Sequence, residues 1–221
     1  MPGIPGIGLF KGDRKIIAMN KQIIFKEQMS RDEIQQLPRN KFAGEIFYID
    51  TYEALSEFIP ELHGESILGF DTETKPAFKK GKTNEVSLLQ LSTAEKAFLI
   101  RLNMIGLPGI IMDILSDASI VKAGVAIHDD IHGLQRINEF KPEGFIDLQE
   151  YVKDFGILDN GLKKLSANIL GFQISKRQQT SNWEQEQLSL AQIEYAATDA
   201  WVCHQIYTKL KKVKKINGSQ H

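Results

Sequence analysis

Short apolar runs typical of buried strands recur between residues 45 and 148, and apolar residues at helical spacing dominate after them. Residues 1–44 show no sustained period except a short helical stretch near 31–36, so we interpret them as an N-terminal arm. Residues 46–49 then predict a strand, and Asp50 with Glu53 forms a capping-box pattern that opens a helix. The folded domain is therefore expected to begin near residue 45.

Three further strand-like runs follow, at residues 66–73, 86–92 and 96–102. The last two lie close enough along the chain to pair as a hairpin. Helix, strand, helix and strand then alternate at residues 110–115, 120–127, 134–137 and 145–148. Alternation of strands with helices favours parallel pairing, whereas a hairpin is antiparallel. The pattern therefore predicts an α/β fold with a mixed β-sheet flanked by α-helices.

The rest of the chain reads as helices, at residues 149–155, 162–170 and 188–212. Gly171 is expected to end the second helix, and Ser189 with Gln192 forms a capping-box pattern near the start of the last. We therefore assign residues 45–212 to one domain and residues 213–221 to a C-terminal tail.

Composition narrows the class of protein without deciding its function. A length of 221 residues suits one well-buried core, and 42% hydrophobic with 25% charged residues is ordinary for a soluble globular protein. The formal net charge of -1 gives no overall attraction to a polyanion, so nucleic-acid binding must depend on local charge. Cys203 is the single cysteine, and no apolar run approaches the roughly 20 residues of a spanning helix. We expect a soluble, cytoplasmic protein that does not bind membranes.

Two acidic residues on the predicted strand 66–73 form the first candidate site. Asp71 and Glu73 are two positions apart, so their side chains project from the same face of the strand. Apolar neighbours indicate that the strand is buried, and like charges held in a core are costly unless a cation neutralises them. The pair therefore indicates a divalent metal site, with a strand end that leaves both carboxylates in water as the alternative.

A tyrosine and a third and fourth carboxylate extend this hypothesis. Tyr195 and Asp199 lie one turn apart on a predicted helix, so that the carboxylate could hold a metal while the phenol orients a water. A core tyrosine bonded to a surface aspartate is the alternative. Asp130 follows the predicted strand 120–127 directly, where helix N-capping is the alternative role and the adjacent Asp129 competes for the metal role.

Taken in order, these residues resemble a known family. Asp71-x-Glu73, then Asp130 with Leu134 four residues later, then Tyr195-x-x-x-Asp199 match the three motifs of the tyrosine-type four-carboxylate (DEDDy) 3′→5′ exonucleases. Similarity is greatest to the Werner-syndrome-type exonuclease domain, through Gly69-Phe70-Asp71, Lys122-Ala123-Gly124-Val125, Ser181-Asn182-Trp183 and Tyr195-Ala196-Ala197-Thr198-Asp199-Ala200. The resemblance covers about residues 45–212 and implies the ribonuclease H-like fold.

The resemblance also implies a mechanism and a substrate. Asp71 is expected to bridge two Mg²⁺ or Mn²⁺ ions, Glu73 and Asp199 to complete the shell of one, and Asp130 to reach the other through water, while Tyr195 positions the attacking water. The implied activity is release of 5′-mononucleotides from 3′ ends by two-metal-ion hydrolysis, with DNA, single-stranded or 3′-ended, favoured. Ribonuclease D carries the same motif type, so an exoribonuclease is the first alternative. A catalytically silent nucleic-acid-binding module on the same fold is the second.

Substrate contacts are predicted around the strand 66–73. The loop after it carries several lysines that can neutralise phosphates and an aromatic ring that can stack on bases, with a solvated loop as the alternative. His132 stands where Werner-type domains carry an aromatic residue, and it is expected either to bond a phosphate or to lie on the helix surface. The predicted substrate-binding residues are Thr72, Phe78, Lys79, Lys80, Lys82 and His132. Trp183 is interpreted as a core anchor, and protein partners are not predicted.

Overall fold

A six-stranded mixed sheet forms the centre of the molecule. The computed structural model describes residues 25–77 and 84–218, with side chains described up to residue 214. The spatial order of the strands is β1-β4-β3-β2-β5-β6. Their bounds are β1 Glu45–Ile49, β2 Ile67–Thr74, β3 Val86–Ser92, β4 Lys96–Ile100, β5 Val121–Gly124 and β6 Phe145–Asp147.

Strand pairing follows the sequence pattern. β2, β3 and β4 are antiparallel neighbours, so the predicted hairpin is confirmed. β1, β5 and β6 each join the sheet in parallel, to β4, β2 and β5 respectively. β2 is therefore a central strand with a partner on both sides, which explains its apolar run.

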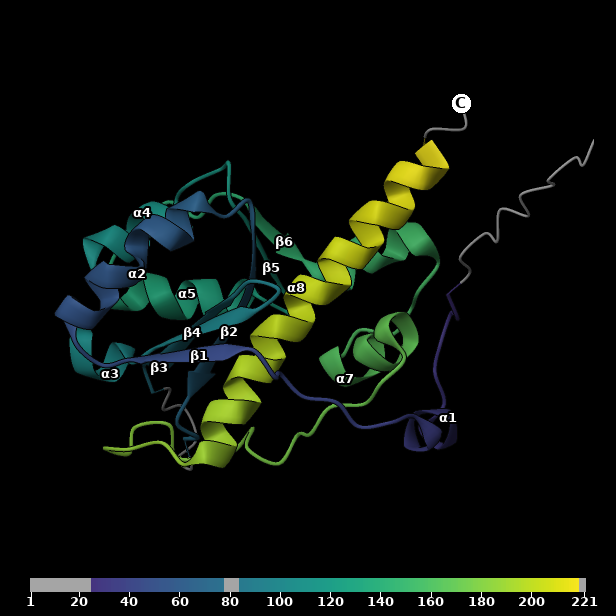
Figure 1. Cartoon of the computed structure of the whole chain (residues 1–221), viewed down its shortest axis with the longest axis horizontal. Coiled ribbons are helices and arrows are strands. Elements are labelled where there is room, and N and C mark those ends of the chain that lie inside the picture. The colour runs from purple at the N-terminus through teal and green to yellow at the C-terminus, as the bar shows by residue number, and fades with distance from the viewer. Residues whose placement is uncertain (1–24, 78–83, 219–221) are drawn as a thin grey trace, which may run out of the picture.

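Four helices cover one face of the sheet (Figure 1). They are α2 Tyr52–Gly64, α3 Leu102–Ile105, α4 Gly109–Leu115 and α5 His128–Ile137. Their apolar residues pack with Phe70, Leu89 and Phe98 of the central strands into one core. The capping residue of α2 differs from the prediction: Thr51, not Asp50, accepts the hydrogen bond from a first-turn backbone N–H, because its side chain lies one residue nearer the helix.

A single long helix, α8 Leu190–Gly218, crosses the opposite face (Figure 1). The predicted capping box is present, because Ser189 Oγ accepts from the Gln192 backbone N–H at 3.3 Å and Gln192 Oε1 accepts from the Ser189 N–H at 3.1 Å. The helix begins at Leu190 rather than residue 188 because Ser189 is this cap. Among the described residues, no helix is both long enough and apolar enough to cross a membrane.

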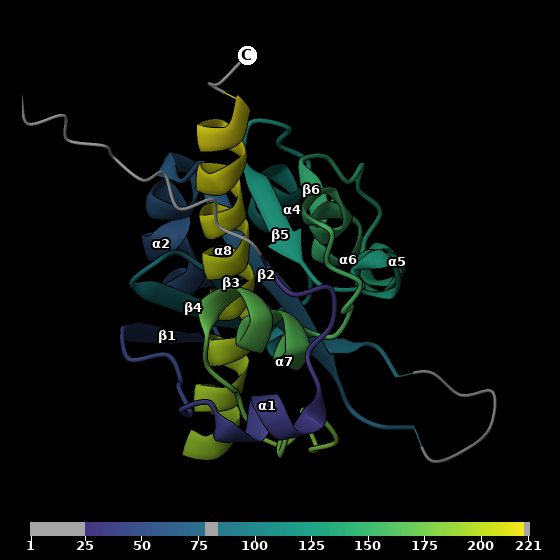
Figure 2. The same cartoon turned by 90° about the vertical axis from the view of Figure 1, so that its right-hand side faces the viewer.

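Shorter helical segments pack beside α8 (Figure 2). They are α6 Leu148–Tyr151, the 3₁₀ turn η1 Val152–Phe155, α7 Leu162–Leu165 and the π-helical turn η2 Ser166–Leu170. Gly171 ends η2 at φ 81°, a left-handed conformation that suits glycine, so this predicted helix end is confirmed. Each of the two predicted helices in this region is thus a short α-helix that continues into an irregular turn.

The predicted strand 120–127 is shorter in the structure, where β5 spans Val121–Gly124. Ala126 has a left-handed backbone with φ 59°, and its N–H donates to Asp147 Oδ1 at 3.1 Å instead of joining a ladder. This turn breaks the extended chain and directs it into α5. The apolar residue Ile127, which extended the sequence pattern, is buried in the core.

Part of the predicted N-terminal arm lies against the domain. α1 spans Arg31–Gln36, at the position the sequence indicates, and Ile34 packs with Met29 and Ala167. Phe42 is 5% exposed and joins the apolar cluster beneath α8. The boundary at residue 45 stays a prediction, but residues 29–42 share core contacts with the domain.

Candidate active site

β2 places Asp71 and Glu73 on the face of the sheet that α8 covers. Gly69 shares this face, and a Cβ atom there would lie 1.9 Å from the Ala200 carbonyl oxygen. Only a residue without a side chain permits this approach, so Gly69 lets the backbone of α8 lie directly against β2. The predicted face of the strand and the predicted face of the helix therefore meet.

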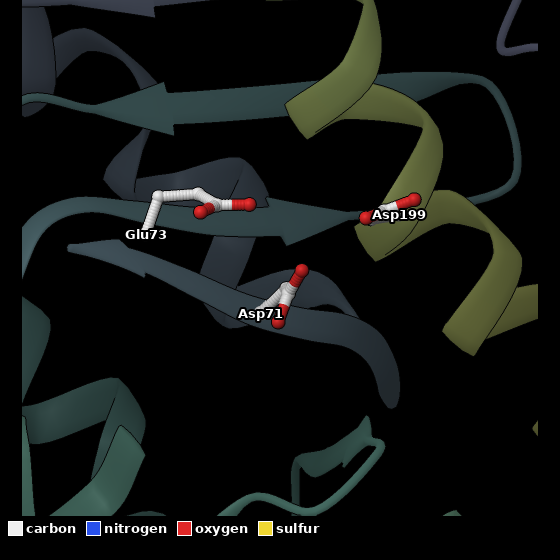
Figure 3. A group of neighbouring side chains, drawn as sticks. All are labelled: Asp71, Glu73 and Asp199. Atoms are coloured by element: carbon white, nitrogen blue, oxygen red, sulfur yellow. The ribbon is translucent and has the colours of Figure 1, made fainter. Parts of the chain in front are cut away.

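Three carboxylates converge where β2 and α8 meet. One oxygen each from Asp71, Glu73 and Asp199 lies within 4.8 Å of the others. Figure 3 shows the three side chains pointing from the strand and the helix into one shared space. Glu73 is 8% exposed and Asp199 6% exposed, so both carboxylates are largely buried rather than in open solvent.

Asp130 occupies a separate position on α5, on the other face of β2. Its carboxylate accepts a hydrogen bond from the Thr72 hydroxyl, whose side chain projects opposite to Asp71. It lies in the first turn of α5 but does not cap the helix, whose N-cap position is Ile127. Thr72, predicted to contact substrate, here orients the fourth carboxylate.

Burial and mutual repulsion strongly perturb these acids. Burial, followed by the charges of Asp199 and Asp130, raises the pKa of Asp71 well above its ordinary value. Burial, then Asp71 and Asp199, raises the pKa of Glu73 to about 10. Burial raises the pKa of Asp199 to about 7, although the Tyr195 hydroxyl and Lys176 act in the opposite direction. Without a cation, this group cannot be fully ionised at neutral pH.

The donor set fits a hard divalent cation. Asp199 Oδ1 is buried and has no hydrogen-bond partner among the described residues, so it retains lone pairs toward the cluster. Carboxylate oxygens are the ligands that Mg²⁺ and Mn²⁺ prefer, and a cation between them offsets the repulsion that raises their pKa values. Among the residues that the structure describes, no histidine belongs to this group, and neither does Cys203.

Tyr195 lies one turn before Asp199 on α8, and its ring packs beside the ring of Trp183. The two rings are 6.1 Å apart between centroids, and Trp183 is 0% exposed, so its interpretation as a core anchor is confirmed. Burial, then the charges of Asp199 and Glu73, raises the pKa of Tyr195 above its ordinary value. The phenol therefore stays protonated and available as a hydrogen-bond donor.

A cleft of about 310 Å³ opens over the carboxylates. Asp71, Glu73, Tyr195 and Asp199 line it together with residues of α6, of the turn before α7 and the start of α7, and of the segment before α8. These segments contribute Gln149, Asn160, Gly161, Leu162, Lys163, Ile174, Ser175, Lys176 and Gln179. Sequence reasoning missed Lys163 and Lys176, because nothing in a local motif places residues 160–179 against β2.

A second cleft of about 350 Å³ lies on the other side of Thr72. Asp130 and Arg136 of α5 line it together with Lys75 and Asn84, which flank the predicted substrate loop. Thr72 lines both clefts, so it forms part of the ridge between them.

The remaining predicted substrate contacts are not decided by the structure. Phe78, Lys79, Lys80 and Lys82 lie outside the described residues. His132 is exposed on α5, where its Nε2 lies 3.2 Å from that of His128. A contact between His132 and substrate stays a prediction.

The fold and the site together define a class: an α/β protein with a ribonuclease H-like sheet and a carboxylate centre suited to divalent cations. The Nibbler EXO domain of Aedes aegypti superposes with a TM-score of 0.71 at 24% identity, over 80% of this chain and 94% of that domain. Escherichia coli RNase D superposes with a TM-score of 0.68 at 24% identity, over 80% of this chain and 47% of that protein. Both confirm the predicted fold.

Sequence comparison gives the family. A family model described as 3′-5′ exonuclease matches residues 46–215, so the chain belongs to the 3′-5′ exonuclease family. The bifunctional 3′-5′ exonuclease/ATP-dependent helicase WRN of Mus musculus is 35% identical over 191 residues, which cover 79% of this chain but 13% of the mouse protein. The chain spans less than half the length of each of the first curated relatives it matches.

Proposed function

We propose that this chain is a metal-dependent 3′→5′ exonuclease that releases 5′-mononucleotides from nucleic-acid 3′ ends, with DNA favoured. The observation that carries the proposal is the convergence of Asp71, Glu73 and Asp199 within 4.8 Å, at the base of a cleft that Tyr195 also lines. Family membership supports the same reaction class. Because all four carboxylates and the tyrosine are present, we favour catalysis over a silent binding module.

Two Mg²⁺ or Mn²⁺ ions are the cofactors we propose. Asp71, Glu73 and Asp199 would hold one ion, and Asp71 with Asp130 would serve the second. Such ions activate water and neutralise charge on the phosphate and on the leaving 3′-oxygen. Oxygen ligands alone and a net negative cluster favour these hard cations over zinc.

The chain's own residues supply positioning and charge. The Tyr195 ring packs beside Trp183, and Tyr195 lines the cleft, where its hydroxyl can orient a water for attack. Lys163 and Lys176 line the same cleft as the carboxylates, where they can neutralise non-reacting phosphates of the bound strand. The two lysines together offset the negative charge of the carboxylates, which would otherwise repel the nucleic-acid backbone.

The preference for DNA is a proposal that rests on the Werner-type motifs. The 35% identity to the mouse exonuclease/helicase agrees with that resemblance. An exoribonuclease is the second candidate, because a solved structure of Trypanosoma brucei RNase D in complex with the RNA U12 shares this fold with a TM-score of 0.67. At 21% identity, that likeness concerns the fold alone.

Strands of matched sequence, made as DNA and as RNA and labelled at either end, test this function. In Mn²⁺ or Mg²⁺ we expect stepwise shortening of 5′-labelled strands and immediate release of mononucleotide from 3′-labelled ones, abolished by excess chelator. We expect faster degradation of DNA than of RNA. Cleavage of a closed circle, or full activity in chelator, would contradict a metal-dependent exonuclease, whereas faster RNA degradation would identify the exoribonuclease.

A further inference from the structure

Gln90 of β3 is a fully buried polar side chain near the carboxylate cluster. It is 0% exposed, yet neither its Nε2 nor its Oε1 has a hydrogen-bond partner among the described residues. A buried carboxamide without partners is destabilising, and an apolar side chain of similar size avoids that cost. A glutamine at this position therefore needs a physical explanation.

The sheet register places Gln90 directly opposite Asp71. β2 and β3 pair with Asp71 against Gln90, and on the other side of β3 Gln90 lies opposite Leu99 of β4. Side chains directly opposite on one face have Cβ atoms about 4.5–5.5 Å apart, a separation that a glutamine carboxamide can span. Gln90 thus lies on the face of the sheet that carries the candidate metal ligands.

The side chains directly across the strands from Gln90 are Asp71 and Leu99, so Asp71 is its polar partner in the register. Leu88 and Leu99 belong to the apolar cluster beneath α8. The hydroxyl of Ser92, two residues along β3, already donates to a carbonyl oxygen at 2.8 Å. Among its direct neighbours across the strands, Asp71 is therefore the polar one.

We propose that Gln90 is a positioning residue whose carboxamide donates a hydrogen bond to the Asp71 carboxylate when Asp71 holds a divalent ion, fixing the orientation of that carboxylate. This inference rests on the metal-dependent function proposed above. A carboxylate that binds a cation keeps lone pairs free to accept from an amide. A lysine or arginine at this position would compete with the cation for Asp71. The amide is neutral, so it can orient Asp71 without this competition.

The variant Gln90→Met tests this role, because methionine has a similar volume and an unbranched chain but no amide. Calorimetric titration with Mn²⁺ should show affinity about 10- to 100-fold weaker than wild type. The kcat for strand cleavage should fall with little change in KM. In chelator, urea unfolding should show the variant to be at least as stable as wild type, because a costly buried amide has been removed.

Leu89→Met is the matched control, because Leu89 is also 0% exposed but projects from the opposite face of β3. It should bind Mn²⁺ with wild-type affinity. Wild-type Mn²⁺ affinity in Gln90→Met would overturn the proposal. If Gln90→Met does not unfold cooperatively, Gln90→Asn, whose carboxamide reaches less far, decides in its place: weaker affinity supports the role and wild-type affinity overturns it.

Calorimetry separates this inference from the proposed function. A wild-type protein that binds Mn²⁺ but cleaves no strand would contradict the exonuclease proposal, while the affinity ratio of the Gln90 and Leu89 variants would still report on positioning. Wild-type activity combined with equal Mn²⁺ affinities in all three proteins would overturn the role of Gln90 alone.

Discussion

Tyr195 and Asp199 lie one turn apart on α8, yet the structure gives them different surroundings. Asp199 faces Asp71 and Glu73 with an oxygen that lacks a hydrogen-bond partner among the described side chains. Tyr195 packs its ring beside Trp183 and lines the same cleft. The charge is thus placed for a cation, and the phenol for a water.

Substitution of these two residues should separate metal binding from chemistry. Asp199→Asn removes a negative charge from the ligand set, so both Mn²⁺ affinity and cleavage rate should fall. Tyr195→Phe removes only a hydroxyl, so Mn²⁺ affinity and stability should stay near wild type while single-turnover cleavage slows by about 10² to 10⁴-fold. Calorimetry and single-turnover kinetics measure the two effects. Wild-type cleavage by Tyr195→Phe would show that the hydroxyl has no part in the reaction.

At the scale of elements, the site depends on how closely α8 approaches β2. The two are in extensive contact, and Gly69 lies where the carbonyl oxygen of Ala200 would meet any side chain. Asp199 precedes Ala200, so the same contact sets the position of a candidate metal ligand. Gly69 is therefore needed both for the packing of α8 on β2 and for the position of Asp199.

Gly69→Ala should move the helix and damage the site. The added methyl group must displace α8, which we expect to cost about 1–3 kcal/mol of stability and to weaken Mn²⁺ binding by separating Asp199 from Asp71. Urea unfolding and Mn²⁺ calorimetry provide the two readings. Gly64→Ala is the control, since a Cβ atom at Gly64 meets nothing within 4 Å. Equal behaviour of the two variants would mean that the close approach at Gly69 is not required.

At the scale of the whole molecule, the carboxylate cluster links stability to pH and to metal. Folding raises the pKa of Glu73 from 4.5 to about 10 and that of Asp199 from 3.8 to about 7. A raised pKa means that the folded state favours the protonated acid. The contribution of each acid to the free energy of unfolding is therefore fully present below its pKa in the unfolded state. It is lost as pH rises toward its pKa in the folded state.

The metal-free protein should accordingly become less stable as pH rises between about pH 5 and pH 9. Glu73→Gln, which mimics the protonated acid, should lose less stability than wild type over this range. Urea unfolding in chelator at several pH values measures the difference. Mn²⁺ at 100 times its Kd should restore about 2.7 kcal/mol to the wild type.

Glu57→Gln, on the exposed side of α2, is the control for the loss of one acid. It should follow the wild-type pH dependence. A Glu73→Gln variant with the same pH slope as wild type would show that Glu73 is already ionised in the metal-free protein, and so would contradict the electrostatic account of the cluster.

The sequence determined most of the elements and the principal carboxylate face. A period of two on β2 and a spacing of four on α8 are local properties, so they placed Asp71 with Glu73 and Tyr195 with Asp199 before any packing was known. Gly171 and the Ser189 cap likewise mark ends that depend on nearby backbone groups. The mixed sheet followed from a hairpin set among alternating strands and helices.

Tertiary structure decided the contacts that join distant parts of the chain. The bond from Thr72 to Asp130 spans 58 residues, and Lys176 joins the lining of the carboxylate cleft from a segment without a recognisable motif. The left-handed turn at Ala126 ends β5 early because a hydrogen bond to the Asp147 carboxylate replaces the strand ladder. The position of the Gln90 carboxamide opposite Asp71 is set by the register of β2 and β3. These contacts depend on which surfaces pack against each other in the folded chain. No local pattern of residue types specifies that packing.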